Sequence, residues 1–236
     1  MKSVLVTGGA RRIGRAISLR LAADGWRVLV HARQPGDADA VALAGEIGGI
    51  AIFGDLSEPL GAAKLFNAAC EVAPELSALV NNAAVFSPFA ELGDDESARI
   101  HAVDFVAAEK LSTMLGLRLM TNDENGVGLP RSGAVVNLLD SRVIGGATPS
   151  TPYERAKAAL MESGVKTARQ FASVLRVNAV APGPVLPPVG VREKAGDMLL
   201  ANRPTPEDVA DAVAYLLSAQ SVTGAVIPVD SGQSLV

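Results

Sequence analysis

The sequence contains one cysteine, Cys70, and aromatic residues make up only 4% of its 236 residues. A single thiol cannot form a disulfide within the chain, so a disulfide framework is excluded. No block of basic residues occurs and the formal net charge is -4, which argues against binding nucleic acid through its phosphates. No apolar run approaches the length of a transmembrane helix, and the run before Gly8 is too short for a signal peptide. We therefore expect a cytoplasmic protein that binds neither membranes nor nucleic acid.

Hydrophobic residues make up 49% of the chain and charged residues 19%, so the chain can bury a large core. Short β-branched runs such as residues 3–6 are typical of strands buried on both faces of a parallel sheet, and segments of helical apolar spacing lie between them. No repeat or linker divides residues 1–236, so we predict a single α/β domain. Further strands are expected at residues 26–30, 50–53, 76–80, 134–139, 175–181 and 225–230.

A glycine-containing turn follows the first predicted strand and leads into a helix. Strand, turn and helix N-terminus in this order direct free backbone N–H groups to one point, which suits the phosphates of a dinucleotide. Arg12 stands where related loops more often have glycine. The candidate cofactor-binding residues of this loop are Gly8, Arg11, Arg12, Ile13 and Gly14.

His31, Ala32 and Arg33 follow the second predicted strand, residues 26–30. An NAD enzyme has an acidic residue at this place to hold the ribose 2′-hydroxyl. A guanidinium instead pairs with a 2′-phosphate, so Arg33 predicts NADP(H), and the three residues are candidates for the cofactor site. The alternative is that Arg33 is an ordinary solvated loop arginine.

Asp55 and Leu56 follow the third predicted strand, at the edge where ligands bind a doubly wound sheet. The Asp55 carboxylate can accept a hydrogen bond from an adenine amino group. It can equally cap the next helix, which we expect to begin near Glu58 and Pro59. Both roles remain open.

The fourth predicted strand leads into Asn82, Ala83 and Ala84, which we place beside the cofactor. The Asn81 and Asn82 amides can fix neighbouring strands and a cofactor ribose, and the alanines leave room for a flat ring. Phe86 is either a stacking surface for a planar substrate or an aromatic side chain packed under a loop.

Pro182, Gly183 and Pro184 close the sixth predicted strand. We expect Pro182 and Gly183 at the cofactor and Pro184 at the substrate. The segment at about 184–202 is expected to form a loop, with a short helix, that covers the substrate.

Tyr153 and Lys157 lie four residues apart, and Asp140 lies thirteen residues before the tyrosine. Residues at this spacing share one helix face, so the ammonium can lie beside the phenol and lower its pKa, which makes Tyr153 a candidate proton donor. Such pairs also occur by chance, as a half-buried tyrosine beside a solvated lysine. Asp140 ends the fifth predicted strand, so it can face the same pocket.

Together these motifs resemble the short-chain dehydrogenase/reductase family, in the right order over nearly the whole chain. The matching pieces are Thr7-Gly8-x-x-x-Arg12-x-Gly14, Asp55-Leu56, Asn81-Asn82-Ala83-Ala84, Tyr153-x-x-x-Lys157, Arg176-Val177-Asn178-x-Val180-x-Pro182-Gly183, Thr223-Gly224 and Val229-Asp230-Ser231-Gly232. The resemblance implies a Rossmann-like, doubly wound, seven-stranded parallel sheet, a nicotinamide cofactor and a homotetramer. It also implies that Tyr153 gives a proton during hydride transfer, while Lys157 holds the nicotinamide ribose and lowers the tyrosine pKa.

Two residues depart from the common family pattern. Asp140 stands where most members have a serine that orients a carbonyl, and a carboxylate is a poor partner for an oxygen that gains negative charge. It suits a ring nitrogen instead. Asp104 stands where an asparagine usually anchors a proton-relay water; an aspartate can still hold a water, or it can signal weakened catalysis. In the pteridine reductase branch of the family a serine that meets the ligand often stands at the position of Ala84.

Asp140, with Arg12, Arg33 and Phe86, resembles the pteridine reductase branch of the family. This resemblance implies substrate contacts by Arg12, Phe86, Asp140, Tyr153 and Pro184, and catalysis by Asp140, Tyr153 and Lys157, without a metal. We predict an NADPH-dependent reductase of a pterin-like C=N bond. The alternatives are a carbonyl reductase of the same family and a non-catalytic NADP-binding regulator.

Overall fold

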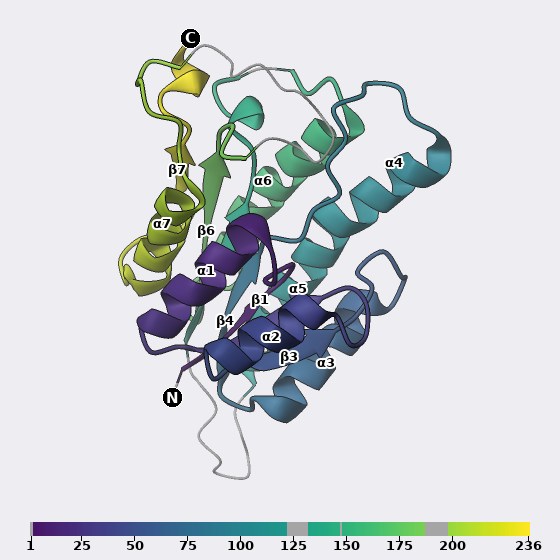
Figure 1. Ribbon diagram of the computed structural model, residues 1–236, viewed down its shortest axis with the longest axis vertical. Helices are drawn as coiled ribbons and strands as arrows, with labels where there is room; N and C mark the ends of the chain where they lie inside the picture. Colours follow the sequence, from purple (N-terminus) through teal and green to yellow (C-terminus); the bar gives the residue numbers. More distant parts are fainter. Residues whose placement is uncertain (1, 122–131, 147, 187–197) are drawn as a thin grey trace.

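The computed structural model describes residues 2–121, 132–146, 148–186 and 198–236. Its centre is a seven-stranded sheet in the order β3-β2-β1-β4-β5-β6-β7, and every neighbouring pair is parallel (Figure 1). The strands are β1 (Ser3–Val6), β2 (Arg27–Ala32), β3 (Ile50–Phe53), β4 (Leu76–Asn81), β5 (Gly133–Leu138), β6 (Leu175–Pro182) and β7 (Val226–Val229). The predicted Rossmann-like α/β fold is confirmed.

Helices cover both faces of the sheet because alternate residues of each buried strand point to opposite sides. Val4 and Val6 of β1 pack with one group of helices, while Leu5 between them packs with the other. The first face carries α1 (Arg12–Ala23), α2 (Ala38–Glu46) and α7 (Pro206–Ser218), and the second carries α3 (Gly61–Val72), α5 (Ala108–Met120) and α6 (Pro152–Gln170) (Figure 1). No helix in these described ranges has the length and hydropathy to cross a membrane.

The N-terminus of α6 is fixed by its own sequence. Thr151 accepts a hydrogen bond from the backbone N–H of Glu154, and the Glu154 carboxylate accepts one in return from the backbone N–H of Thr151. Pro152 occupies the first helical position, where its missing N–H costs nothing. This capping box places Tyr153 in the first turn of α6.

The helix expected at residues 96–120 contains a π-helical segment that the sequence did not predict. The chain forms α4 (Asp94–His101), then a π segment (Ala102–Ala107), and then α5. One wider turn changes the direction of the side chains within it, and the π segment turns Asp104 inward, where it is almost fully buried.

The helix expected near Glu58 and Pro59 begins at Gly61, after a turn. Of the expected substrate-covering segment at 184–202, residues 187–197 lie outside the described residues.

The strand order reverses between β1 and β4, and the two strand ends are tied together at this point. The Thr7 hydroxyl accepts hydrogen bonds from the backbone N–H groups of Asn82 and Ala83 at 2.9 and 3.0 Å. The Asn82 amide donates to the carbonyls of Thr7 and Gly8. One strand further along, Asn81 donates to the Asn137 side chain at 2.8 Å, so both predicted asparagines do fix neighbouring strands.

His31, at the end of β2, joins the glycine turn to the end of β3. Its Nδ1 accepts a hydrogen bond from the Gly8 N–H at 3.1 Å, so its Nε2 carries the proton and donates to the Gly54 carbonyl at 2.9 Å. The Nδ1 contact requires a neutral imidazole, because a protonated ring has no acceptor nitrogen. Burial lowers the pKa of His31 below its ordinary value of 6.5.

This lowered pKa predicts a loss of stability in mild acid. Below pH 6.5 the unfolded chain takes up a proton at this histidine before the folded chain does, so the free energy of unfolding falls as the pH drops toward the folded pKa. The slope is at most about 1.4 kcal/mol per pH unit. Urea unfolding between pH 7 and pH 5 measures it, and His31→Gln should flatten the dependence.

The chain has only one other histidine, His101, which is exposed. His101→Gln is therefore the matched control and should keep the slope of the unmodified protein. An equal slope in His31→Gln would show that this imidazole is not held neutral by the fold.

Candidate functional site

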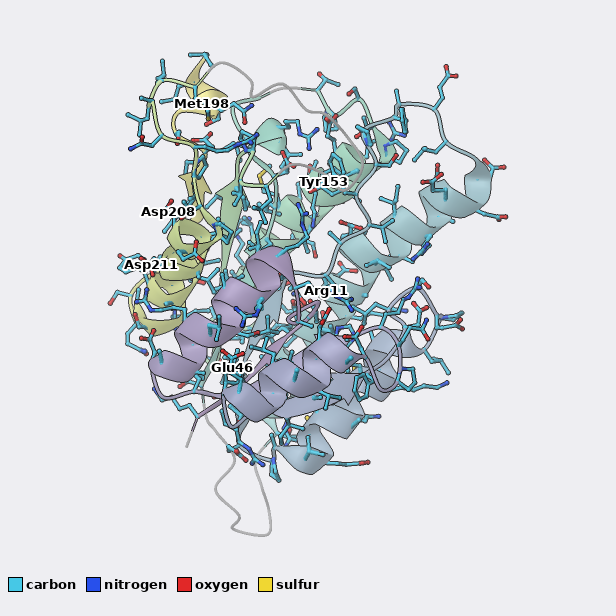
Figure 2. The ribbon with its side chains drawn as sticks, in the orientation of Figure 1. Arg11, Glu46, Tyr153, Met198, Asp208 and Asp211 are labelled. Atoms are coloured by element: carbon cyan, nitrogen blue, oxygen red, sulfur yellow. The ribbon has the colours of Figure 1, made fainter. Side chains whose placement is uncertain are left out.

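A cleft of about 970 Å³ lies at the carboxyl ends of the strands, above the point where the strand order reverses. Arg11 and Tyr153 both lie on this side of the molecule (Figure 2). Every predicted site residue except Ala32 lines the cleft, and Ala32 is buried in the sheet. The lining residues among them are Gly8, Arg11, Arg12, Ile13, Gly14, His31, Arg33, Asp55, Leu56, Asn82, Ala83, Ala84, Phe86, Asp140, Tyr153, Lys157, Pro182, Gly183 and Pro184.

The glycine turn at the start of α1 leaves backbone N–H groups available to a ligand. Arg11, the residue before α1, makes no capping hydrogen bond to the helix, and the first turn contains no acidic residue. The Arg11 guanidinium is instead ion-paired with Asp37, at 2.8 Å, and with Asp39. Gly8 has a φ of +59°, and a side chain on Gly14 would collide with the Gly8 carbonyl. The geometry fits a phosphate at this helix end.

Arg12 adopts a φ of +54°, a conformation that glycine takes readily and other residues rarely. Its guanidinium donates to the carbonyl of Leu186, on the far side of the cleft, at 3.4 Å. The arginine therefore connects the glycine turn to the chain that follows β6, which a glycine could not do.

Arg33 and Asp55 face each other at the adenosine end of the predicted cofactor site. The Arg33 side chain is half exposed and its Nε lies 4.0 Å from Asp55 Oδ2. Asp55 Oδ1 accepts from the backbone N–H and hydroxyl of Ser57, and these hydrogen bonds lower the pKa of Asp55. Asp55 thus closes a turn, and the alternative that it caps the next helix is wrong, because α3 begins only at Gly61.

Lys157 and Asp104 form a buried ion pair beneath the cleft. The Lys157 side chain is 2% exposed, and its Nζ lies 3.2 Å from Asp104 Oδ1 while donating to the Leu138 carbonyl at 3.0 Å. Asp104 Oδ2 accepts from the Val85 backbone N–H at 2.7 Å. Burial raises the pKa of Asp104, and the neighbouring ammonium opposes that rise.

Tyr153 lies above this pair, and its hydroxyl donates to Asp140 Oδ2 at 3.3 Å. The expected lowering of its pKa by Lys157 is wrong for this structure. Burial raises the pKa of Tyr153 well above 10, and the negative charges of Asp140 and Asp104 add to the effect. The ammonium charge is already paired with Asp104, so it offers little to a phenolate.

Arg142 is the main site residue that sequence reasoning missed. Its Nε and backbone N–H both donate to Asp140 Oδ1, at 3.0 and 2.9 Å, and its second guanidinium nitrogen donates to Oδ2 at 2.9 Å. Asp140 in turn raises the pKa of Arg142. Its position two residues after Asp140 was the available signal, because a short 3₁₀ turn, Ser141–Val143, brings the two side chains together.

Phe86 stands at the mouth of the cleft with 37% of its surface exposed. Its ring meets that of Tyr153 edge to face, with centroids 5.1 Å apart and an interplanar angle of 78°. The Arg142 guanidinium lies against both rings. Phe86 is therefore packed on one side and open to the cleft on the other.

Comparison with known proteins supports a reductase of this fold. The family described as Enoyl-(Acyl carrier protein) reductase matches residues 8–234. A short chain dehydrogenase/reductase, astE, of Aspergillus oryzae is 32% identical over 100% of this chain and 95% of its own length. Pteridine reductase 1 of Leishmania tarentolae is 29% identical over 98% of this chain and 96% of its own length.

Among solved structures, FolM alternative dihydrofolate reductase 1 from Brucella suis, in complex with NADP, has a TM-score of 0.85 and 31% identity. The alignment covers 100% of this chain and 96% of that one. The sheet order, the glycine turn and the Tyr153–Lys157 arrangement agree with these similarities. The chain belongs to the short-chain dehydrogenase/reductase family.

Proposed function

We propose that this protein is an NADPH-dependent reductase of a C=N bond in a pterin-like ring. The observation that carries the proposal is the hydrogen bond between the Tyr153 hydroxyl and the Asp140 carboxylate, at the wall of a cleft that Phe86 also lines. It joins a candidate proton donor to a carboxylate instead of a serine hydroxyl.

The chain's own residues fit NADPH. The uncapped start of α1 and the left-handed backbone of Gly8 before it suit the diphosphate, and the half-exposed Arg33 guanidinium suits the 2′-phosphate. Lys157, which lines the cleft floor, would hold the nicotinamide ribose. The bound nucleotide supplies the hydride.

Tyr153 is the proposed proton donor. The phenol is protonated at neutral pH, so a proton is available at the hydroxyl oxygen when a substrate nitrogen becomes basic. Asp140 orients that hydroxyl through the 3.3 Å hydrogen bond.

The choice of a ring nitrogen over a carbonyl oxygen follows from charge. A ketone gains negative charge on oxygen during hydride transfer, and a carboxylate beside that oxygen would oppose the change. Nitrogen of a C=N bond is more basic and takes a proton as the hydride arrives, so it becomes an N–H that can donate to Asp140 instead of an anion beside it. Similarity to a pteridine reductase and to an alternative dihydrofolate reductase supports the same substrate class.

We also propose the homotetramer that the family resemblance implies. Leu117 and Met120, one turn apart on α5, are both more than half exposed, which suits a helix that meets another subunit.

The activity is tested by adding dihydrobiopterin or dihydromonapterin to the protein with NADPH and following the loss of NADPH absorbance. We expect turnover, and a fall in kcat of at least about a hundredfold in Tyr153→Phe because the proton donor is lost. Tyr215→Phe, which changes an exposed tyrosine on α7, is the control and should leave the rate unchanged. Turnover of simple ketones without turnover of pterins would favour the carbonyl reductase, and cofactor binding without any turnover would favour the regulator.

The contribution of Asp104 to the raised pKa of Tyr153 is tested by titrating that tyrosine directly. The chain has two tyrosines, so a Tyr215→Phe background leaves Tyr153 as the sole source of the tyrosinate absorbance. Asp104→Asn should lower the pKa of Tyr153, because it removes a nearby negative charge and leaves the Lys157 ammonium unpaired. Asp95→Asn, an exposed change on α4, should not. An unchanged titration in Asp104→Asn would mean that the buried pair does not control the phenol.

The cofactor preference is tested at Arg33. Arg33→Asp should weaken NADPH binding by about ten- to a hundredfold, the usual effect of losing a charge-assisted hydrogen bond, with little change for NADH. Lys64→Asp makes the same charge change on the exposed side of α3 and is the control. Nucleotide fluorescence gives both dissociation constants, and an unaltered NADPH preference would remove Arg33 from the site.

A further inference from the structure

Arg142 occupies the surface that a flat substrate would need. Its guanidinium carbon lies 5.3 Å from the centroid of the Phe86 ring and 5.8 Å from that of Tyr153. A guanidinium is itself planar and packs on aromatic rings much as a heterocycle does. A flat ring that stacks on Phe86 beside Tyr153 therefore meets the Arg142 side chain.

Arg142 also donates hydrogen bonds to both carboxylate oxygens of Asp140. Oδ1 receives two donors from Arg142, and Oδ2 receives one from Arg142 and one from Tyr153. The Asp140 side chain is only 14% exposed. A substrate that is to pair with this carboxylate must replace guanidinium donors with its own.

Glu154 provides a second place for the displaced guanidinium. Its Oε2 is held by Ser150 and Thr151, whereas its Oε1 lies 3.8 Å from a guanidinium nitrogen of Arg142. The Arg142 side chain is 37% exposed, so it has room to move. Asp140, Glu154 and Arg142 together carry one excess negative charge, which favours N–H donors over anions in the slot.

We propose that Arg142 is a displaceable occupant of the substrate slot that competes with the substrate for Asp140, the carboxylate that selects the edge of the ring. The Arg142 guanidinium leaves Asp140 only when a flat heterocycle brings ring N–H or amino donors to that carboxylate. The guanidinium then pairs with Glu154. A flat molecule without such donors would leave a poorly hydrated carboxylate unpaired, which is strongly unfavourable. The inference rests on the proposed function, since it assigns the ring edge that meets Asp140.

The role of Arg142 is tested by measuring the binding of ligands instead of their turnover. Two flat bicyclic probes are titrated into the NADP⁺ complex: 2,4-diaminopteridine, which has amino donors, and quinoxaline, which has none. We expect the unmodified protein to bind the first and to bind quinoxaline at least about tenfold more weakly.

Arg142→Met should lower the dissociation constants of both probes at least about tenfold, because no charge-assisted pair has to be broken first. Arg142→Lys, which keeps the charge without the planar fork, should give intermediate values and guards against a misfolded methionine variant.

Arg155→Met is the matched control. Arg155 lies on α6 next to Glu154, is exposed and donates to the Ser150 carbonyl, but it does not line the cleft. Its replacement should leave both dissociation constants unchanged.

Glu154→Gln tests the second position of the guanidinium. A glutamine can keep the acceptor of the capping box but loses the charge that receives Arg142. We expect weaker diaminopteridine binding in Glu154→Gln alone and no further effect of this change in the Arg142→Met protein.

The outcomes separate the two proposals. Unchanged or weaker binding of both probes in Arg142→Met and Arg142→Lys would overturn the role of Arg142, even with pterin turnover intact. Tighter quinoxaline binding in Arg142→Met, with no diaminopteridine binding by any variant, would keep Arg142 as the occupant of the slot but overturn its donor specificity and the pterin-like substrate.

Discussion

The candidate site depends on the buried ion pair between Lys157 and Asp104. Both side chains are almost fully excluded from water, and removing one partner of such a pair costs about 3–5 kcal/mol. The pair links α6 to the π segment, and through the Leu138 carbonyl it fixes the ammonium at the end of β5. In this pair the charge of the Lys157 ammonium is neutralised by the Asp104 carboxylate. Burial raises the pKa of the neighbouring Tyr153 phenol, and the charges of Asp140 and then Asp104 add to the rise.

A second set of charges lies above the first. Asp140 accepts from Tyr153 and Arg142, and Arg142 also approaches Glu154, which belongs to the capping box of α6. The same local sequence that starts the helix thus supplies a carboxylate to the substrate slot. In our proposals Asp104 of the lower pair contributes to the raised pKa of the proton donor, and Asp140 in the upper cluster selects the ring that receives the proton.

Much of the fold was predictable because its determinants are local. Runs such as Val4–Val6 are apolar at every position, which only a strand covered on both faces requires. Thr151, Pro152 and Glu154 define a helix start within four residues. The π segment at Ala102–Ala107 was not predictable, because one wider turn leaves the apolar spacing of a long helix nearly unchanged.

By itself, the sequence determined the order of strands and helices, the glycine turn and the identity of the groups at the strand ends, since these follow from spacing and residue type. The tertiary structure decided how those groups are paired. Asp104 and Lys157 are far apart in the chain, and only packing brings them to 3.2 Å. The direction of the Tyr153 pKa and the hold of Arg142 on Asp140 both depend on distance and burial, which residue spacing does not specify.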